Sequence, residues 1–312
     1  MTEDSVNPVV VGVDGTDNAF GSARWAAAIA SKLGAPLHIV HARPYPGHNL
    51  SDAVAAARAS EMAAEETAAP SILASAEQAV RRGFGDLRIT TANVPDTIDR
   101  LLVDLSQYAR MIVLGSDEVK PGAAILVGST TVAVATNATC PVVAWRGDVT
   151  APTAQPIVIG VDGEDDSRVA ITAAFELAQC LGVSIVAVHA WSARRSPGDV
   201  ALSFMIDWEA VKADERGRLV NTLAPWTRLY PEVDVTYVVD QDKPSRALLH
   251  HSEGAQLVVI GSRGRGPLAG AVLGSTGLNL LHHSVIPTMI CRSMRAPEDF
   301  APRHQFRERA QR

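Results

Sequence analysis

A glycine-rich segment in the second half of the chain combines residue types that bind phosphate. Glycine lets the backbone approach a ligand closely, and a helix start presents free N–H groups at the positive end of the helix dipole. Hydroxyl donors and two guanidinium groups add to these features. The predicted phosphate-binding residues are Gly261, Ser262, Arg263, Gly264, Arg265, Gly266, Gly274, Ser275 and Thr276.

Two interpretations fit this segment. A glycine-rich turn closed by a helix cap needs no ligand at all. However, Arg263 and Arg265 place fixed positive charge inside the segment, which suits phosphate better than any neutral ligand. The sequence therefore predicts a phosphate site where a helix begins near Gly274.

An aspartate follows the first apolar run of each half of the chain. Asp14 lies in Val-Asp-Gly-Thr and Asp162 in Val-Asp-Gly-Glu. A carboxylate at this position is able to accept hydrogen bonds from an adenine amino group or a ribose hydroxyl. The glycine that follows it is equally typical of an Asx-turn or a helix cap, which these residues alone favour.

Motifs of other nucleotide-binding and catalytic classes are missing from the sequence. There is no GxxxxGK[ST], no GxGxxG after the first apolar run and no GxSxG, so a P-loop NTPase, a dinucleotide-binding domain and a nucleophile elbow are not predicted. The pairs His250-His251 and His282-His283 consist of adjacent residues, which do not share a helix face and make poor metal ligands. We expect no metal site and no catalytic residue. Trp191 either packs in the core or borders a nucleotide pocket.

The chain is an internal duplication. Pro8–Gly15 and Pro156–Gly163 match at a separation of 148 positions, and Val127–Thr130 and Leu273–Thr276 match at 146 positions. Collinear matches at a nearly constant separation are the signature of a repeated structural unit. We therefore expect two similar domains.

The boundaries follow from composition. A small, polar, proline-containing stretch separates the two copies, and a tail rich in proline and arginine follows the second. We place the first nucleotide-binding domain at residues 1–147, the second at 156–292 and a mobile tail at 293–312.

Each copy alternates short apolar runs with helical stretches. In the first copy we expect strands at Val9–Val13, Leu37–His41, Leu87–Val94, Met111–Leu114 and Val142–Trp145, and helices at Asn18–Leu33, Ser51–Arg82, Thr97–Ala109 and Gly128–Asn137. Pro70 is expected to interrupt the second helix. This alternation predicts two α/β doubly wound domains, each with a parallel sheet flanked by helices and with ligands outside the carboxyl ends of the strands.

Composition and charge argue against several partner classes. The formal net charge of −6 gives no global attraction for nucleic acid or anionic lipid. The apolar runs are too short to span a bilayer, and the polar N-terminus is unlike a signal peptide. The three cysteines, Cys140, Cys180 and Cys291, form no CxxC pair. We expect a cytoplasmic protein without nucleic-acid or membrane partners.

Together these features resemble the universal stress proteins in their tandem form. The family's ATP-binding signature is Gly, two residues, Gly, nine residues, Gly and then Ser or Thr, and it is matched by Gly261, Gly264, Gly274 and Ser275. The resemblance covers Pro8 to Arg292. It implies five parallel strands per domain in the order 3-2-1-4-5, and ATP as the ligand, accompanied by Mg²⁺.

The resemblance also assigns residues to the ATP site. The family's first-strand aspartate matches Asp14 and Asp162, and its adenine-facing valine matches Val40 and Val188. In the second domain the implied site joins Gly160, Asp162 and Val188 to the glycine-rich segment. The weaker counterpart in the first domain comprises Gly12, Asp14, Val40, Gly115, Gly128, Ser129 and Thr130.

The first domain departs from the signature. Glu118 stands where the second glycine is required, and Asp117 stands opposite Arg263. A charge about 6 Å from a phosphate contributes roughly 0.7 kcal/mol in water and about 3 kcal/mol at an effective dielectric of 20. Lys120 offsets part of the added negative charge. We therefore expect tight ATP binding in the second domain only.

Three function classes remain. The leading hypothesis is an ATP-binding stress-response regulator, which acts in signalling or growth control through nucleotide-dependent conformation or association with unknown protein partners. We expect its halves to form an intramolecular pseudo-dimer, with a homodimer as a further possibility. The alternative is an adenylating or ATP-hydrolysing enzyme, but the repeats leave no room for a substrate domain and no general base is evident. A purely structural module is disfavoured by the intact signature.

Overall fold

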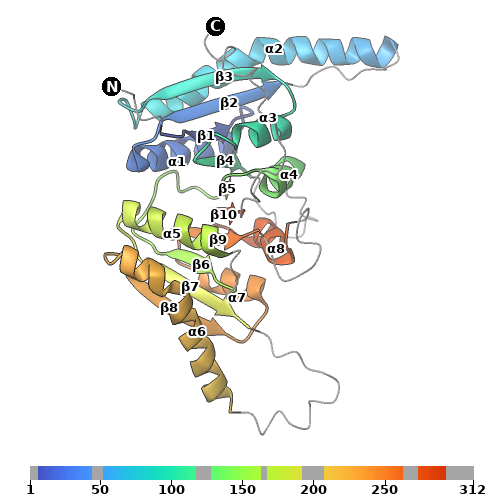
Figure 1. The fold of residues 1–312 in the computed structure, drawn as a ribbon. Helices are drawn as coiled ribbons and strands as arrows, with labels where there is room; N and C mark the ends of the chain where they lie inside the picture. The colour runs from blue at the N-terminus through green and yellow to red at the C-terminus, as the bar shows by residue number, and fades with distance from the viewer. Residues whose placement is uncertain are drawn as a thin grey trace.

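The strands of the whole chain form one continuous sheet. The computed structural model describes residues 6–43, 52–116, 128–162, 167–191, 207–262 and 273–292. Within them, ten strands are hydrogen-bonded in the order β3-β2-β1-β4-β5-β10-β9-β6-β7-β8. Helices lie on both sides of this sheet (Figure 1).

Strands and helices alternate in both halves. The first half contains β1 (Val9–Gly12), α1 (Asp17–Leu33), β2 (Leu37–Arg43), α2 (Asp52–Arg81), β3 (Ile89–Pro95), α3 (Ile98–Leu105), β4 (Met111–Gly115), α4 (Ser129–Asn137) and β5 (Val142–Trp145). The second half contains β6 (Ile157–Gly160), α5 (Arg168–Leu181), β7 (Ile185–Ala190), α6 (Trp208–Leu229), β8 (Val235–Asp240), α7 (Pro244–His251), β9 (Leu257–Gly261), α8 (Ser275–His283) and β10 (Thr288–Cys291).

Each half has the predicted strand order. β1 lies between β2 and β4, with Val11 in register with Ile39 and Val113, and all of these pairings are parallel. β6 lies in the same way between β7 and β9. β1 is buried along its whole length, which explains its continuous run of valines. The order 3-2-1-4-5 and the doubly wound α/β class are confirmed.

Two apolar layers enclose the sheet. Val9 and Val11 face a core shared with α1, α2, α5 and α6, whereas Val10 faces a core shared with α3, α4, α7 and α8. Successive residues of a strand point to opposite faces, so one run of valines supplies both cores. Among the described residues, no helix is long and apolar enough to cross a membrane.

The two halves join through their edge strands. β5 and β10 pair antiparallel, with Met289 opposite Val143. An edge strand has unpaired backbone N–H and C=O groups, and each half satisfies those of the other. The sequence predicts two five-stranded sheets but not their fusion into one.

The prediction that Pro70 interrupts the second helix is wrong. α2 continues through Pro70, and α6 likewise contains Pro225. A proline removes one backbone hydrogen bond, but Ala69 and Ala76, on either side of Pro70, are completely buried. Packing on both sides of the proline holds the helix together.

Candidate functional site

The start of α8 has the backbone features of an anion site. Gly274 is its N-cap residue, with φ −58° and ψ 153°, and no side chain caps the first turn among the described residues. The N–H of Gly274 donates to the carbonyl of Ser262 at 3.1 Å, which places Ser262 beside the helix start. The first N–H groups of α8 are therefore available to an anion.

Ser262 carries a buried hydroxyl with an unmet hydrogen-bonding capacity. The residue is 7% exposed, and its Oγ finds no hydrogen-bond partner in the part of the chain that the structure describes. Its backbone N–H donates to Cys291 O at 2.7 Å, which fixes it against β10. An unpaired buried hydroxyl costs about 1–3 kcal/mol, so a ligand oxygen at this position would recover free energy.

The matching serine of the first domain is already engaged. Ser116 Oγ accepts hydrogen bonds from Arg146 Nε at 3.2 Å and Nη2 at 3.0 Å. Arg146 is 5% exposed, and its Nη1 donates to Ser284 O at 3.1 Å, in the other half of the chain. The two equivalent serines therefore differ, because an arginine donates to Ser116 whereas Ser262 Oγ has no partner among the described residues.

The two glycines of the first-domain site, Gly115 and Gly128, differ in how closely neighbouring atoms pack around them. A Cβ on Gly115 would lie 2.9 Å from the backbone of Asn18, so Gly115 is required for the packing of α1 against β4. Gly128, the N-cap residue of α4, has no heavy atom within 4 Å of such a Cβ among the described residues. Ser129 is exposed and Thr130 half-buried at this helix start, as Ser275 and Thr276 are in the second domain.

Asp14 forms the turn that precedes α1. Its Oδ1 accepts hydrogen bonds from Thr16 N at 3.0 Å and from Thr16 Oγ1 at 2.7 Å, and Thr16 in turn caps Ala19 N at 3.2 Å. This is the Asx-turn that the residues alone favour. Asp162 is half-buried and also has an interaction partner, and the residues that follow it lie outside the described ranges.

The paired aspartates yield a test of nucleoside binding. We expect Asp162→Ala to weaken ATP and adenosine alike, by about tenfold, because both would lose the same carboxylate contact. Asp14→Ala is the matched control, and it should lower the free energy of unfolding by about 1 kcal/mol with no change in ATP affinity. Calorimetric titration and thermal melting of both variants check this. A turn-cap role for Asp162 predicts lower stability with unchanged affinity.

The two valines assigned to adenine lie in the core. Val40 is 0% and Val188 1% exposed, and their carbonyls accept hydrogen bonds from Val13 N and Val161 N. Both side chains are therefore covered by neighbouring residues in this structure. Gly12 and Gly160 are close-packed as well, because a Cβ there would meet Leu114 and Leu248 respectively.

Four predicted site residues lie outside the described residues, namely Arg263, Gly264, Arg265 and Gly266. The same holds for Asp117, Glu118 and Lys120 of the first domain, and for the tail at 293–312. Their assignments stay predictions from the sequence.

Other candidate residues make contacts within the described parts of the chain. The ring of Trp191 packs against Trp208, with 5.8 Å between centroids. His251 Nε2 lies 3.2 Å from Asp240 Oδ2, and no group of three metal-ligating side chains occurs in the described ranges. Burial raises the pKa of the Cys140 thiol to about 12, so this thiol stays protonated at neutral pH.

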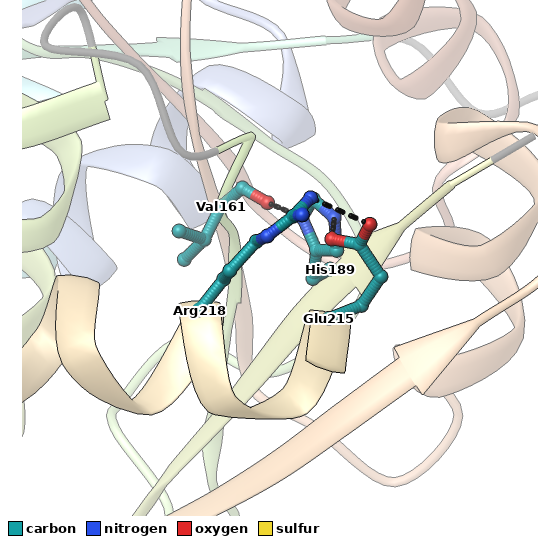
Figure 2. A network of polar contacts seen from close by, with 4 residues as sticks. All are labelled: Val161, His189, Glu215 and Arg218. Carbon is teal, nitrogen blue, oxygen red and sulfur yellow. Dashed lines mark hydrogen bonds and ion pairs between the residues drawn. The ribbon is translucent and has the colours of Figure 1, made fainter. Parts of the chain in front are cut away.

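Sequence reasoning assigned no role to two residue pairs at the carboxyl ends of the strands. His41 and His189 each donate from Nδ1, at 2.7 Å, to the carbonyl preceding Asp14 and Asp162 respectively. Figure 2 shows this contact for His189, together with Glu215. The duplication could have pointed to both pairs, because His41 matches His189 and Arg146 matches Arg292, 146 positions further along.

Comparisons with known proteins match both halves of this chain to one protein family. The model of the universal stress protein family matches residues 6–146 and again 153–292. A universal stress protein of Mycobacterium tuberculosis is 33% identical over 302 residues, which cover 91% of this chain and 96% of that protein. One of Mycolicibacterium smegmatis is 32% identical over 299 residues, with the same coverage.

A solved structure agrees with the fold. The crystal structure of a universal stress protein from Archaeoglobus fulgidus superposes with a TM-score of 0.63 at 18% identity, covering 93% of this chain and 99% of that one. At this identity the likeness concerns the fold alone. Because the family model matches both halves and relatives match nearly the whole chain, this chain belongs to the universal stress protein family.

Proposed function

We propose that this universal stress protein is an ATP-binding regulator, and that its second domain holds the triphosphate at the start of α8. Membership of the family places the chain in the stress response. The proposal adds the ligand and its position. ATP binding would change the conformation or association that protein partners detect, in keeping with population shift by a ligand.

One observation carries the proposal: among the described residues, the buried hydroxyl of Ser262 has no hydrogen-bond partner and lies beside a helix start that no side chain caps. Free N–H groups and the helix dipole attract an anion, and the hydroxyl supplies a further donor. The sequence adds Arg263 and Arg265 a few positions before Gly274. These groups suit a polyphosphate better than a neutral ligand.

We further propose a regulator rather than an enzyme. Catalysis of hydrolysis needs a general base within hydrogen-bond reach of an attacking water. Among the described residues at the α8 start, Ser262, Ser275 and Thr276 carry hydroxyls, and Asp162 lies at the end of a different strand, β6. Mg²⁺ commonly enters such sites on the phosphates and keeps several water ligands, so it would need no dedicated set of protein ligands.

Ser262→Ala gives the sharpest test of this proposal. We expect the variant to bind ATP and inorganic triphosphate about tenfold more weakly, because a hydrogen bond to a charged oxygen is lost. Without ligand the variant should be as stable as the parent, or about 1 kcal/mol more stable, because an unpaired buried hydroxyl is removed. Isothermal titration calorimetry and urea unfolding measure the two quantities.

Ser116→Ala is the matched control in the first domain. It removes one acceptor of the buried Arg146 guanidinium, so it should lower the free energy of unfolding by about 1–3 kcal/mol and leave ATP affinity unchanged. A loss of stability in Ser116→Ala but not in Ser262→Ala, together with weaker ATP binding in Ser262→Ala alone, supports the proposal. Unchanged ATP affinity in folded Ser262→Ala contradicts the proposal.

A further inference from the structure

His189 connects three elements near the carboxyl end of β7. Its Nδ1 donates to Val161 O at 2.7 Å, because a carbonyl can only accept, and its Nε2 lies 3.4 Å from Glu215 Oε2 on α6. Val161 N also donates to Val188 O at 3.0 Å. Both peptide groups flanking the Val161 Cα are thus tied to β7, and Asp162 is the next residue along the chain.

Glu215 holds the ring of His189 from the other side. Its second oxygen, Oε1, accepts from Arg218 Nη1 at 2.9 Å. The side chains of His189 and Glu215 are only 12% and 18% exposed, whereas that of Arg218 is 73% exposed. Figure 2 shows His189 between the Val161 carbonyl and the Glu215 carboxylate. The carbonyl at Nδ1 and the carboxylate at Nε2 together restrict the orientation of the ring.

The first domain has only half of this arrangement. His41 makes the same 2.7 Å hydrogen bond to Val13 O, immediately before Asp14. Within the described residues, no carboxylate forms an ion pair with His41, although neighbouring Arg43 pairs with Glu66 of α2. In the described structure, the contact from a strand-end histidine to the long helix, here called the His189–Glu215 brace, is therefore present only in the second domain.

We propose that His189, oriented by Glu215, is the positioning residue that sets the nucleoside end of the ATP site. It fixes the Val161 carbonyl, and through it the direction in which Asp162 leaves β6. A carboxylate held in one direction keeps its hydrogen bonds to a ribose or adenine without ordering cost on binding. The brace therefore contributes affinity for the nucleoside and none for the phosphates, which bind at α8. This inference rests on the proposed function.

The test separates the two ends of the ligand. Full-length His189→Ala should bind ATP about tenfold more weakly, while affinity for inorganic triphosphate changes less than twofold. His189→Asn retains a side-chain N–H donor for Val161 O and should recover most of the loss. Glu215→Gln keeps a hydrogen-bonding group without the charge and should lie between the parent and His189→Ala. Calorimetric titrations give the affinities, and thermal melting confirms folding.

His41→Ala is the matched control. It removes an identical hydrogen bond, so it should lower the melting temperature about as much as His189→Ala does, with ATP affinity unchanged. Unchanged ATP affinity in folded His189→Ala overturns the inference. If His189→Ala does not fold, unchanged ATP affinity in Glu215→Gln overturns it instead. Equal losses for ATP and triphosphate overturn it too, since they indicate general loosening.

Failure of the proposed function has a different signature. In that case the parent protein binds neither ATP nor triphosphate, or its binding is insensitive to Ser262→Ala. Parent binding that depends on Ser262 but not on His189 leaves the proposed function standing and removes only the positioning role.

Discussion

Gly274→Glu is expected to abolish ATP binding while the fold is retained. The substitution places a carboxylate at the N-cap of α8, where the phosphates are proposed to lie. Repulsion between this charge and the triphosphate, together with the lost space, should lower affinity by more than about a hundredfold. The φ of −58° at Gly274 is open to any residue, so the helix start should survive. Equilibrium binding of labelled ATP measures the loss.

The control for this variant is a glycine-to-glutamate change elsewhere. Gly85 lies in the turn after α2, and a Cβ there meets no heavy atom of the described residues within 4 Å. Gly85→Glu adds the same charge to the chain far from α8 and should leave both ATP affinity and the melting temperature unchanged. A folded Gly274→Glu protein that binds ATP like the parent contradicts the placement of the phosphates at α8.

One tightly bound ATP per chain is the second expected result. The first domain has Asp117 and Glu118 where the second has Arg263 and Gly264, so its loop repels a polyphosphate. Both the charge and the lost glycine act in the same direction, and together they amount to a few kcal/mol, or about a hundredfold or more in affinity. Calorimetric stoichiometry on the full chain measures this directly.

The structure adds a second reason for this asymmetry. Arg146 satisfies Ser116 in the first domain, whereas the equivalent Ser262 has no partner among the described residues. An arginine follows the last strand in both domains, Arg146 in the first and Arg292 in the second. Arg146 therefore gives the first domain no positive charge that the second domain lacks. The contrast in loop charge between the domains therefore stands.

Exchange of the loop residues tests whether these residues cause the expected difference in ATP binding between the domains. Replacing Asp117 by Arg and Glu118 by Gly should raise the stoichiometry toward two, since the loop then resembles its counterpart. Among the described residues, nothing lies within 4 Å of a Cβ on Gly128 at the start of α4. Two equivalent tight sites in the parent protein show instead that the charges of the first loop are neutralised on binding.

The sequence by itself determined the local pattern of this protein. Val9–Gly12 and Ile157–Gly160 are buried strands because their β-branched runs suit a sheet covered on both faces. The repeat fixed two equivalent units, and the resemblance supplied the strand order that the structure confirms. Helix boundaries agree where a cap is explicit, as at Gly34, which ends α1 with φ 62°.

Only the tertiary structure decided how distant polar groups meet. Arg146 reaches both Ser116 and Ser284, and His189 reaches both Val161 and Glu215, across sequence separations that no local pattern encodes. The same holds for the pairing of β5 with β10 and for the continuity of α2 through Pro70. Backbone propensity and hydrophobic period act over a few residues, whereas these contacts depend on which surfaces the packed elements bring together.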